Sequence, residues 1–303
     1  MLWILITILA YLILSVVFLI DKHLITDSIP NPKLYAFYTG FLGILVFAIS
    51  PFVNFYIPHF PQLALALLAG MVTVYSFFWF YKTLQLFETS RVVPAIGGIL
   101  PLFTLLIIFI FSGGKETLTV SEIPAFIFLV LGSILITYNR SAKISLPSLK
   151  FSTITAFFFA LDFALTKYVY LSQPFWNGFI WISTGGFLMA LYFFISSRDI
   201  KEEIFKKQII FKGKTLFTFL LNKIMGAVAS LLQNWAIFLA PIAGVAIINA
   251  LQGIQYAFLL VLTVFLSVRF PKIFEEKITK GIIFQKIIAI LLIGLGLVFL
   301  FLK

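Results

Sequence analysis

Ten long apolar segments occupy almost all of this chain of 303 residues. They lie near 2–20, 34–54, 62–84, 90–112, 121–138, 151–171, 175–196, 214–239, 242–267 and 282–302. A helix needs roughly 20 apolar residues to cross the hydrocarbon core of a bilayer. Because lipid offers no hydrogen-bonding partners, the backbone of such a segment must satisfy itself, as a helix does. The sequence therefore predicts an all-α integral membrane protein with ten transmembrane helices.

The composition supports this class. Hydrophobic residues make up 62% of the chain and charged residues 11%, whereas soluble domains contain about 25% charged residues. The short alternating segments of a transmembrane barrel are not present. The first segment has no basic leader and no small-residue cleavage site, so we interpret it as a retained helix. We expect no soluble domain.

The positive charges indicate the topology. Loops after the first, third, fifth, seventh and ninth segments, counted with the adjoining segment ends, hold 18 of the 22 Lys and Arg residues. The positive-inside rule makes this side cytoplasmic and places both termini outside. In a cell membrane, plasma or inner, such charge contacts anionic headgroups. The net charge of +11 therefore predicts no nucleic-acid partner.

Several kinds of chemistry have no support in the sequence. There is no cysteine and only two histidines, so we expect no thiolate site, no metal and no other cofactor. The motifs of serine hydrolases, zinc proteases and phosphate-binding loops are missing. We therefore expect no enzyme, and energy for any transport would come from a gradient or from exchange.

The ten segments divide into two halves of five, residues 1–142 and 143–303. An ungapped offset of 145 superimposes the first two segments on the sixth and seventh and matches four residue pairs: Phe18 with Phe163, Lys22 with Lys167, Thr39 with Thr184, and Gly40 with Gly185. An offset near 153 places the fourth segment on the ninth. Because each half has an odd number of segments, the halves would be inserted in opposite directions. Such inverted repeats form a substrate site at their interface and alternate its access.

Two stretches carry a family resemblance. The sequence FYKTLQLFETSRVVPAIGGILPLFTLLI (80–107) and its counterpart NWAIFLAPIAGVAIINALQGIQYAFLLVL (234–262) resemble the repeat signature of the drug/metabolite transporter superfamily, EamA type. The resemblance implies a ten-helix carrier made of two inverted repeats. It also implies basic residues after the second segment and cytoplasmic termini. The loop SPFVNFYIPHFPQ has no lysine or arginine, so resemblance and charge disagree about the side of the termini.

Four ionisable residues inside or at the ends of segments are candidate coupling or substrate sites, because charge in lipid is costly. Asp162 is either a proton-coupling or amine-binding group or part of a structural polar contact. Lys223 either pairs with Asp162 or contacts substrate. Lys22 and Lys167 are equivalent in the repeat, and we favour snorkelling to the headgroups over neutralisation of an anionic substrate.

Polar and aromatic residues supply the other candidates. In the ninth segment Asn249, Gln252 and Tyr256 recur at helical spacing on one face, as a cavity wall or as contacts between helices. Trp79 and Trp235 lie near the ends of the third and eighth segments. We favour a role as interface anchors over closure of a substrate pocket.

The function predicted from these features is secondary transport of a small organic metabolite or drug, with export as the direction. Protons are the candidate coupling ion, and the substrate and the bilayer are the expected partners. The alternatives are an intramembrane enzyme and a membrane scaffold subunit that transports nothing. The chain gives no indication whether it acts as a monomer or a homodimer.

Overall fold

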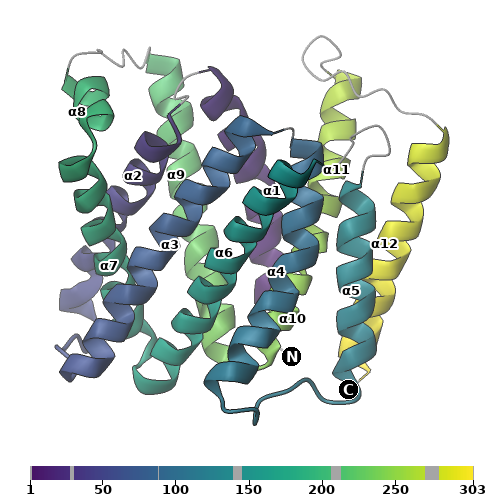
Figure 1. The fold of residues 1–303 in the computed structure, drawn as a ribbon, viewed down its shortest axis with the longest axis horizontal. Helices are drawn as coiled ribbons and strands as arrows, with labels where there is room; N and C mark the ends of the chain where they lie inside the picture. The colour runs from purple at the N-terminus through teal and green to yellow at the C-terminus, as the bar shows by residue number, and fades with distance from the viewer. Residues whose placement is uncertain are drawn as a thin grey trace.

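A computed structural model of the chain describes residues 2–27, 31–87, 89–138, 145–205, 213–269 and 280–302. These residues form helices joined by short connections (Figure 1). In chain order they are α1 (Leu2–Asp27), α2 (Pro32–Gly43), the 3₁₀ helix η1 (Ile44–Phe52), α3 (Phe60–Leu86), α4 (Thr89–Phe111), α5 (Glu122–Thr137), α6 (Leu146–Ser172), α7 (Phe175–Ser196), α8 (Arg198–Phe205), α9 (Gly213–Leu239), α10 (Gly244–Ala250), α11 (Gln252–Arg269) and α12 (Lys280–Phe301).

The helices have the length and surface of membrane spans. Within the described residues, nine segments are long and apolar enough to cross a bilayer, and α5 is a shorter apolar helix. Large apolar side chains also face outward: Leu5, Leu9 and Leu12 form an exposed stripe along α1. A soluble protein would not leave such stripes uncovered, whereas lipid is a suitable solvent for them. The prediction of an all-α, multi-pass membrane protein is therefore confirmed, and the fifth span is shorter than expected.

The helices alternate in direction. In Figure 1 the chain begins at the bottom with α1, and α12 returns to the bottom, so both termini lie on one side. The C-terminal ends of α1, α3, α5, α7 and α11 lie on the opposite side (Figure 1). These are the ends next to which the sequence concentrates its lysine and arginine residues. The charge bias therefore corresponds to one face of the helix bundle.

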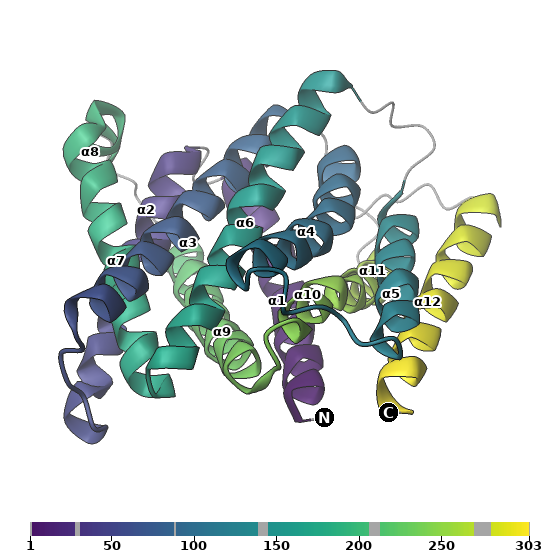
Figure 2. The ribbon, with the colours of Figure 1, turned by 60° about the horizontal axis from the view of Figure 1, so that its bottom comes forward.

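Most helix contacts join segments that are distant in sequence. Helix α6 packs between α3 and α4, and α1 packs along α9 and also against α11 (Figure 2). Further contacts pair α2 with α7, α5 with α12, and α4 with α10. The first five spans and the last five thus share one core and do not form separate domains.

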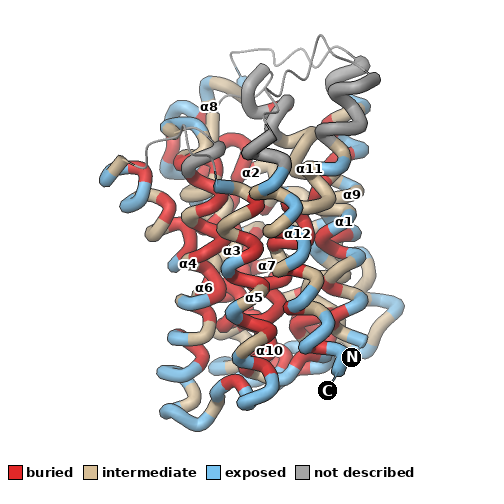
Figure 3. The backbone as a smooth tube through the Cα atoms, turned by 90° about the vertical axis from the view of Figure 1, so that its right-hand side faces the viewer, coloured by how far each residue is buried: buried red, intermediate tan, exposed pale blue. Residues whose placement is uncertain are grey.

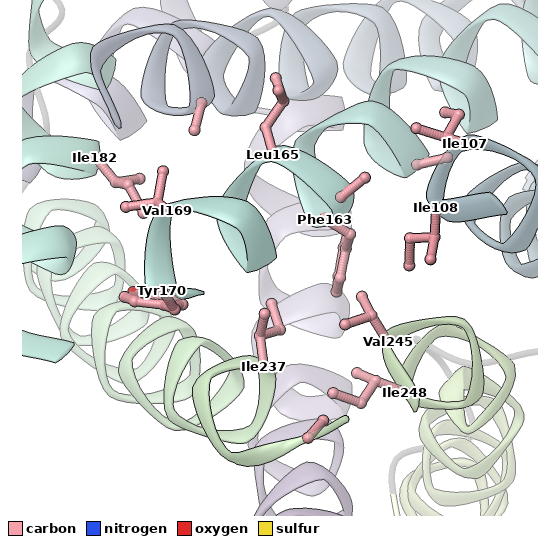
Figure 4. Close-up of a cluster of buried hydrophobic side chains, with 14 of the residues drawn as sticks. Ile107, Ile108, Phe163, Leu165, Val169, Tyr170, Ile182, Ile237, Val245 and Ile248 are labelled. Atoms are coloured by element: carbon pink, nitrogen blue, oxygen red, sulfur yellow. The ribbon is translucent and has the colours of Figure 1, made fainter. Parts of the chain in front are cut away.

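The core lies where the most buried spans meet, which are α4, α6 and the α10–α11 segment. Figure 3 shows buried residues along the central helices and a largely exposed outer face on α12. In the close-up, Ile108 of α4, Phe163 of α6, Ile237 of α9 and Val245 of α10 point toward one another (Figure 4). Residues of α6 before and after Asp162 and Lys167 belong to this apolar cluster.

Two predicted spans are not continuous α-helices. The second changes from α2 to the 3₁₀ helix η1 at Ile44. The ninth breaks at Leu251, where α10 ends and α11 begins. Between the seventh and eighth spans, residues 198–205 form helix α8. Residues 206–212 lie outside the described residues, as does the predicted repeat boundary at 142–143.

Glycines permit the closest helix approach, between α3 and α7. A Cβ atom on Gly70 would collide with the backbone carbonyl of Ile182, and one on Gly185 would collide with the carbonyl of Leu67. The obstacle is backbone on both sides, so a side chain there can only be accommodated if the helices move apart.

We expect Gly70→Ala to destabilise the protein by about 1–3 kcal/mol, the cost of overpacking a tight contact. The free energy of unfolding, or the melting temperature of the purified protein in detergent, measures the effect. Gly294→Ala is the matched control, since a Cβ atom there has no neighbour within 4 Å. Equal stability of the two variants would contradict the close contact.

Candidate functional site

A buried polar cluster joins α1, α2 and α9. The Asp21 carboxylate accepts hydrogen bonds from the Tyr35 hydroxyl and from the Asn222 amide, the latter at 2.6 Å. Tyr35 is fully buried, and its ring lies 4.8 Å from that of Tyr81, edge to face. A carboxylate inside the bundle is therefore held by neutral donors from two other helices.

Lys223 belongs to the same cluster. Its ammonium lies 3.3 Å from the Thr39 hydroxyl and 4.0 Å from the centroid of the Tyr35 ring, over its face. The ring of Phe219 lies 5.5 Å away. Lys223 and Asp21 interact electrostatically, but the two charges form no ion-pair contact among the described residues. Asp21 is thus stabilised by the nearby Lys223 charge and by neutral donors, and Lys223 also lies over aromatic rings.

Asp162 occupies a second site, on α6. Its side chain is 8% exposed and lies ten residues before the end of the helix at Ser172. The Thr73 hydroxyl of α3 donates to it at 2.6 Å, and the Thr166 hydroxyl one turn along α6 lies 3.5 Å away. A carboxylate with hydroxyl partners and no cation is either ionised at high cost or protonated, so this site could exchange a proton.

The structure does not form the pair that the sequence suggested between Asp162 and Lys223. Lys223 contacts α2 and interacts with Asp21, whereas Asp162 contacts Thr73. The pairing hypothesis was wrong because Lys223 has another carboxylate nearby, that of Asp21. Asp21 follows the apolar segment 2–20 in the sequence, but it lies within α1, which continues to Asp27.

Lys167 corrects a second expectation. It is 4% exposed, so it does not snorkel. Its ammonium donates to three carbonyl oxygens at the end of α9: Ile237 at 3.1 Å, Phe238 at 3.2 Å and Ala240 at 2.6 Å. The last carbonyls of a helix lack backbone donors and favour a cation. Since lysine has three N–H donors, Lys167 has none left for a substrate. Its predicted counterpart Lys22 lies in α1, with its side chain outside the described residues.

The polar residues of the ninth span lie on both sides of its break. Asn249 ends α10 and is fully buried; its amide nitrogen donates to the Thr104 hydroxyl of α4 at 2.7 Å. Gln252 begins α11, and Tyr256 is buried one turn later, next to Gly97 of α4. The amide oxygens of Asn249 and Gln252 are buried and have no hydrogen-bond donor. The stripe predicted on one helix is thus divided between two.

The two tryptophans pack between helices. The ring of Trp79 stacks on Phe158 of α6 at 6.4 Å, and its buried indole nitrogen has no acceptor. The ring of Trp235 lies 4.3 Å from that of Phe175 in α7. Trp79 lies seven residues before the end of α3, and Trp235 four residues before the end of α9.

Sequence reasoning missed Asp21, Tyr35 and Thr73. Their signal is weak, because Asp21 and Tyr35 lie beside polar span boundaries and Thr73 is a single polar residue in an apolar stretch. Only their partners reveal them, and those partners are up to 201 residues away. No group of three or more histidine or acidic side chains that could hold a metal ion occurs among the described residues.

Comparison with known proteins gives the fold and little else. No family model matches the chain, and no curated protein matches it. Twenty-eight chains of solved structures match. One of them, described only as "Crystal structure of protein", has a TM-score of 0.67 and 14% sequence identity, over 99% of this chain and 96% of its own. At that identity the likeness concerns the fold alone.

The contacts of Lys167 lead to a stability prediction. Lys167→Met should destabilise the protein by about 3 kcal/mol, since three buried carbonyls lose a charged donor. Melting temperature in detergent measures the loss, and Lys115→Met in an exposed loop is the control. A substrate-binding role alone would leave the stability of the empty protein unchanged.

The Asp21 cluster leads to a second prediction. In a double-mutant cycle of Asp21→Asn and Lys223→Met, we expect a coupling energy of about 2 kcal/mol, because each single variant leaves one partly buried charge without its neighbour. The same cycle between Asp162→Asn and Lys223→Met should be additive within about 0.5 kcal/mol. The reverse pattern would restore the pair suggested by the sequence.

Proposed function

We propose that this chain is a secondary transporter for a small organic metabolite or drug, built from two five-span halves inserted in opposite directions. The observation that carries the proposal is that two carboxylates, Asp21 and Asp162, each accept a hydrogen bond from the other half. Asp21 of the first half is bound by Asn222 of the second, and Asp162 of the second half is bound by Thr73 of the first. Polar contacts at the interface of two such halves are expected where a substrate or a coupling ion passes.

The pattern of helix pairs supports the inverted duplication. If the spans are numbered by half, α1 corresponds to α6, α3 to α9 and α4 to α10–α11. The contact between α1 and α9 then has its counterpart in that between α6 and α3. The contact of α1 with α11 likewise corresponds to that of α6 with α4, while α2 with α7 and α5 with α12 are pairs of equivalent helices. A twofold relation between oppositely inserted halves generates this set of pairs.

The helix bounds support the same relation. Helix α3 ends at Leu86 and α9 at Leu239, 153 residues later, which is the second of the two offsets found in the sequence. The resemblance to EamA-type carriers extends the proposal to that superfamily and to export.

One pair of equivalent positions is chemically asymmetric. In the register of α3 on α9, Gly70 corresponds to Lys223. Gly70 packs closely on α7 near Ile182, whereas Lys223 reaches Thr39 of α2. The same position therefore closes a helix contact in one half and places a charge between helices in the other. We propose that this charged side of the interface contacts substrate and that Asp162 couples transport to protons.

The charge bias supports an orientation in which the lysine-rich face is cytoplasmic and both termini are outside. The bilayer would be that of the cell, plasma or inner. This assignment conflicts with the cytoplasmic termini of EamA-type carriers, and we favour the charge bias because it involves most of the basic residues of the chain.

Flux measurements in proteoliposomes test the function. With a panel of organic compounds and an imposed pH gradient, we expect the wild-type protein to move at least one compound against its gradient. Asp162→Asn should lose nearly all of this pH-driven accumulation, since its side chain cannot exchange a proton, and should keep passive exchange of the same compound.

Asp199→Asn serves as the control because it removes a carboxylate from the exposed surface of α8. If Asp162→Asn transported with unchanged pH dependence, Asp162 would not be the coupling group. If the folded wild-type protein moved no compound, the carrier proposal itself would fail.

A further inference from the structure

The interruption of the ninth span creates an unusual concentration of oxygen atoms. Helix α10 has seven residues and ends at Ala250, and α11 resumes at Gln252. The break therefore lies about 10 Å along the span from Gly244, at 1.5 Å per residue. The last carbonyls of a helix carry partial negative charge, and here the Leu251 N–H donates to those of Ile247 and Asn249. At this break, the carbonyl of Ile248 receives its hydrogen bond from the Tyr11 hydroxyl of α1, at 2.9 Å.

Two side-chain oxygens add to these carbonyls. Asn249 Oδ1 and Gln252 Oε1 are both buried without a hydrogen-bond donor, on the two sides of the break. The orientation of the Asn249 amide is fixed by its neighbour. Because the Thr104 hydroxyl donates to the carbonyl of Leu100 at 2.9 Å, it accepts from Asn249, so the nitrogen of the amide faces Thr104 and the oxygen faces away. Flipping the amide would place two acceptors against each other.

Helices α4 and α5, which pack against the break, each contribute a further polar group whose hydrogen bonding is incomplete among the described residues. Pro101 lies inside α4 and has no N–H, so the carbonyl of Gly97 has no helical donor. A Cβ atom on Gly97 would lie 3.2 Å from Ser133 Oγ, a buried hydroxyl that has no partner. Buried acceptors without donors cost free energy inside a membrane protein. A ligand that carries positive charge and needs only acceptors would remove this cost.

We propose that the break between α10 and α11 binds a small monovalent cation, Na⁺, through Asn249 Oδ1, Gln252 Oε1 and carbonyl oxygens at the end of α10. Interrupted helices in membranes offer carbonyls and C-terminal ends to cations in this way. The oxygens at the break are neutral, whereas divalent cations are generally held by carboxylates. Na⁺ binding does not depend on transport; its use as a coupling ion rests on the proposed function.

The test measures binding in the purified wild-type protein, without transport. At constant ionic strength maintained with choline chloride, Na⁺ should raise the melting temperature with the logarithm of its concentration above the dissociation constant, by about 3 °C at a tenfold excess. K⁺ should have a smaller effect. Equilibrium binding of radioactive Na⁺ should saturate at about one ion per chain, as expected for one site.

Substitutions then locate the site. Asn249→Leu and Gln252→Leu should abolish the Na⁺-dependent shift, whereas Asn234→Leu on α9 should retain it. Asn249→Asp preserves the shape of the side chain and adds a negative charge that attracts the cation. In the equilibrium binding measurement it should lower the half-saturating Na⁺ concentration about tenfold. This increase in Na⁺ affinity would test the proposed site even if the leucine variants do not fold.

Equal effects of Na⁺, K⁺ and choline would overturn the proposal and leave water as the occupant of the break. A larger effect of K⁺ than of Na⁺, or an Asn249→Asp variant with unchanged Na⁺ dependence, would also overturn it. None of these results would contradict transport, because a carrier coupled only to protons needs no Na⁺ site. Conversely, Na⁺ binding without any flux would refute the function and preserve the site.

Discussion

The cost of placing polar groups where water is scarce governs the arrangement of these helices. Asp21, Asp162, Lys167 and Lys223 each find partners on another helix. Asp21 is bound by Tyr35 and Asn222, and Lys167 by the end of α9. Apolar packing alone discriminates poorly between helix partners in lipid, because the lipid tails are as apolar as leucine. These few polar contacts therefore specify which helices are neighbours, and the large apolar cluster fills the space around them.

The spans could be predicted from sequence because hydropathy over about 20 residues depends on local composition. Which span ends share a face of the bundle could also be predicted, since lysine and arginine follow alternate spans. The partner of a polar residue could not. Lys167 looked like a snorkelling lysine because its sequence neighbours place it near a span end; its actual environment is the end of α9, 70 residues away. The polar stripe of the ninth span was recognised, whereas the break at Leu251 was not, as neither glycine nor proline marks that position.

Two equivalent helix contacts, α3 with α7 and α9 with α2, are formed by side chains of different size. The contact of α3 with α7 is closed by glycine against backbone, a contact that tolerates no displacement without loss of packing. On the equivalent side, α9 and α2 meet through the long side chains of Lys223, Tyr35 and Phe219. Long side chains can change rotamers while helices shift, so this side is the more deformable one. Under the proposed alternating access, we therefore expect α9 and α2 to separate more readily than α3 and α7.

The Asp162 site and the break between α10 and α11 are linked through the apolar core. Phe163 follows Asp162 directly on α6, and in Figure 4 its ring points toward Val245 and Ile248 of α10. The carbonyl of Ile248 is in turn bound by Tyr11 of the first half. A change in the charge of Asp162 that rotated or shifted α6 would thus press on the helix that ends at the break, and an ion at the break would resist that movement. Occupancy of the two sites is coupled whenever α6 and α10 move as packed neighbours, since a ligand that favours one packing arrangement at one site must favour it at the other. This coupling requires no direct contact between the Asp162 carboxylate and the proposed ion. It requires that Phe163 fill the space between α6 and α10, so that a shift of one helix displaces the other.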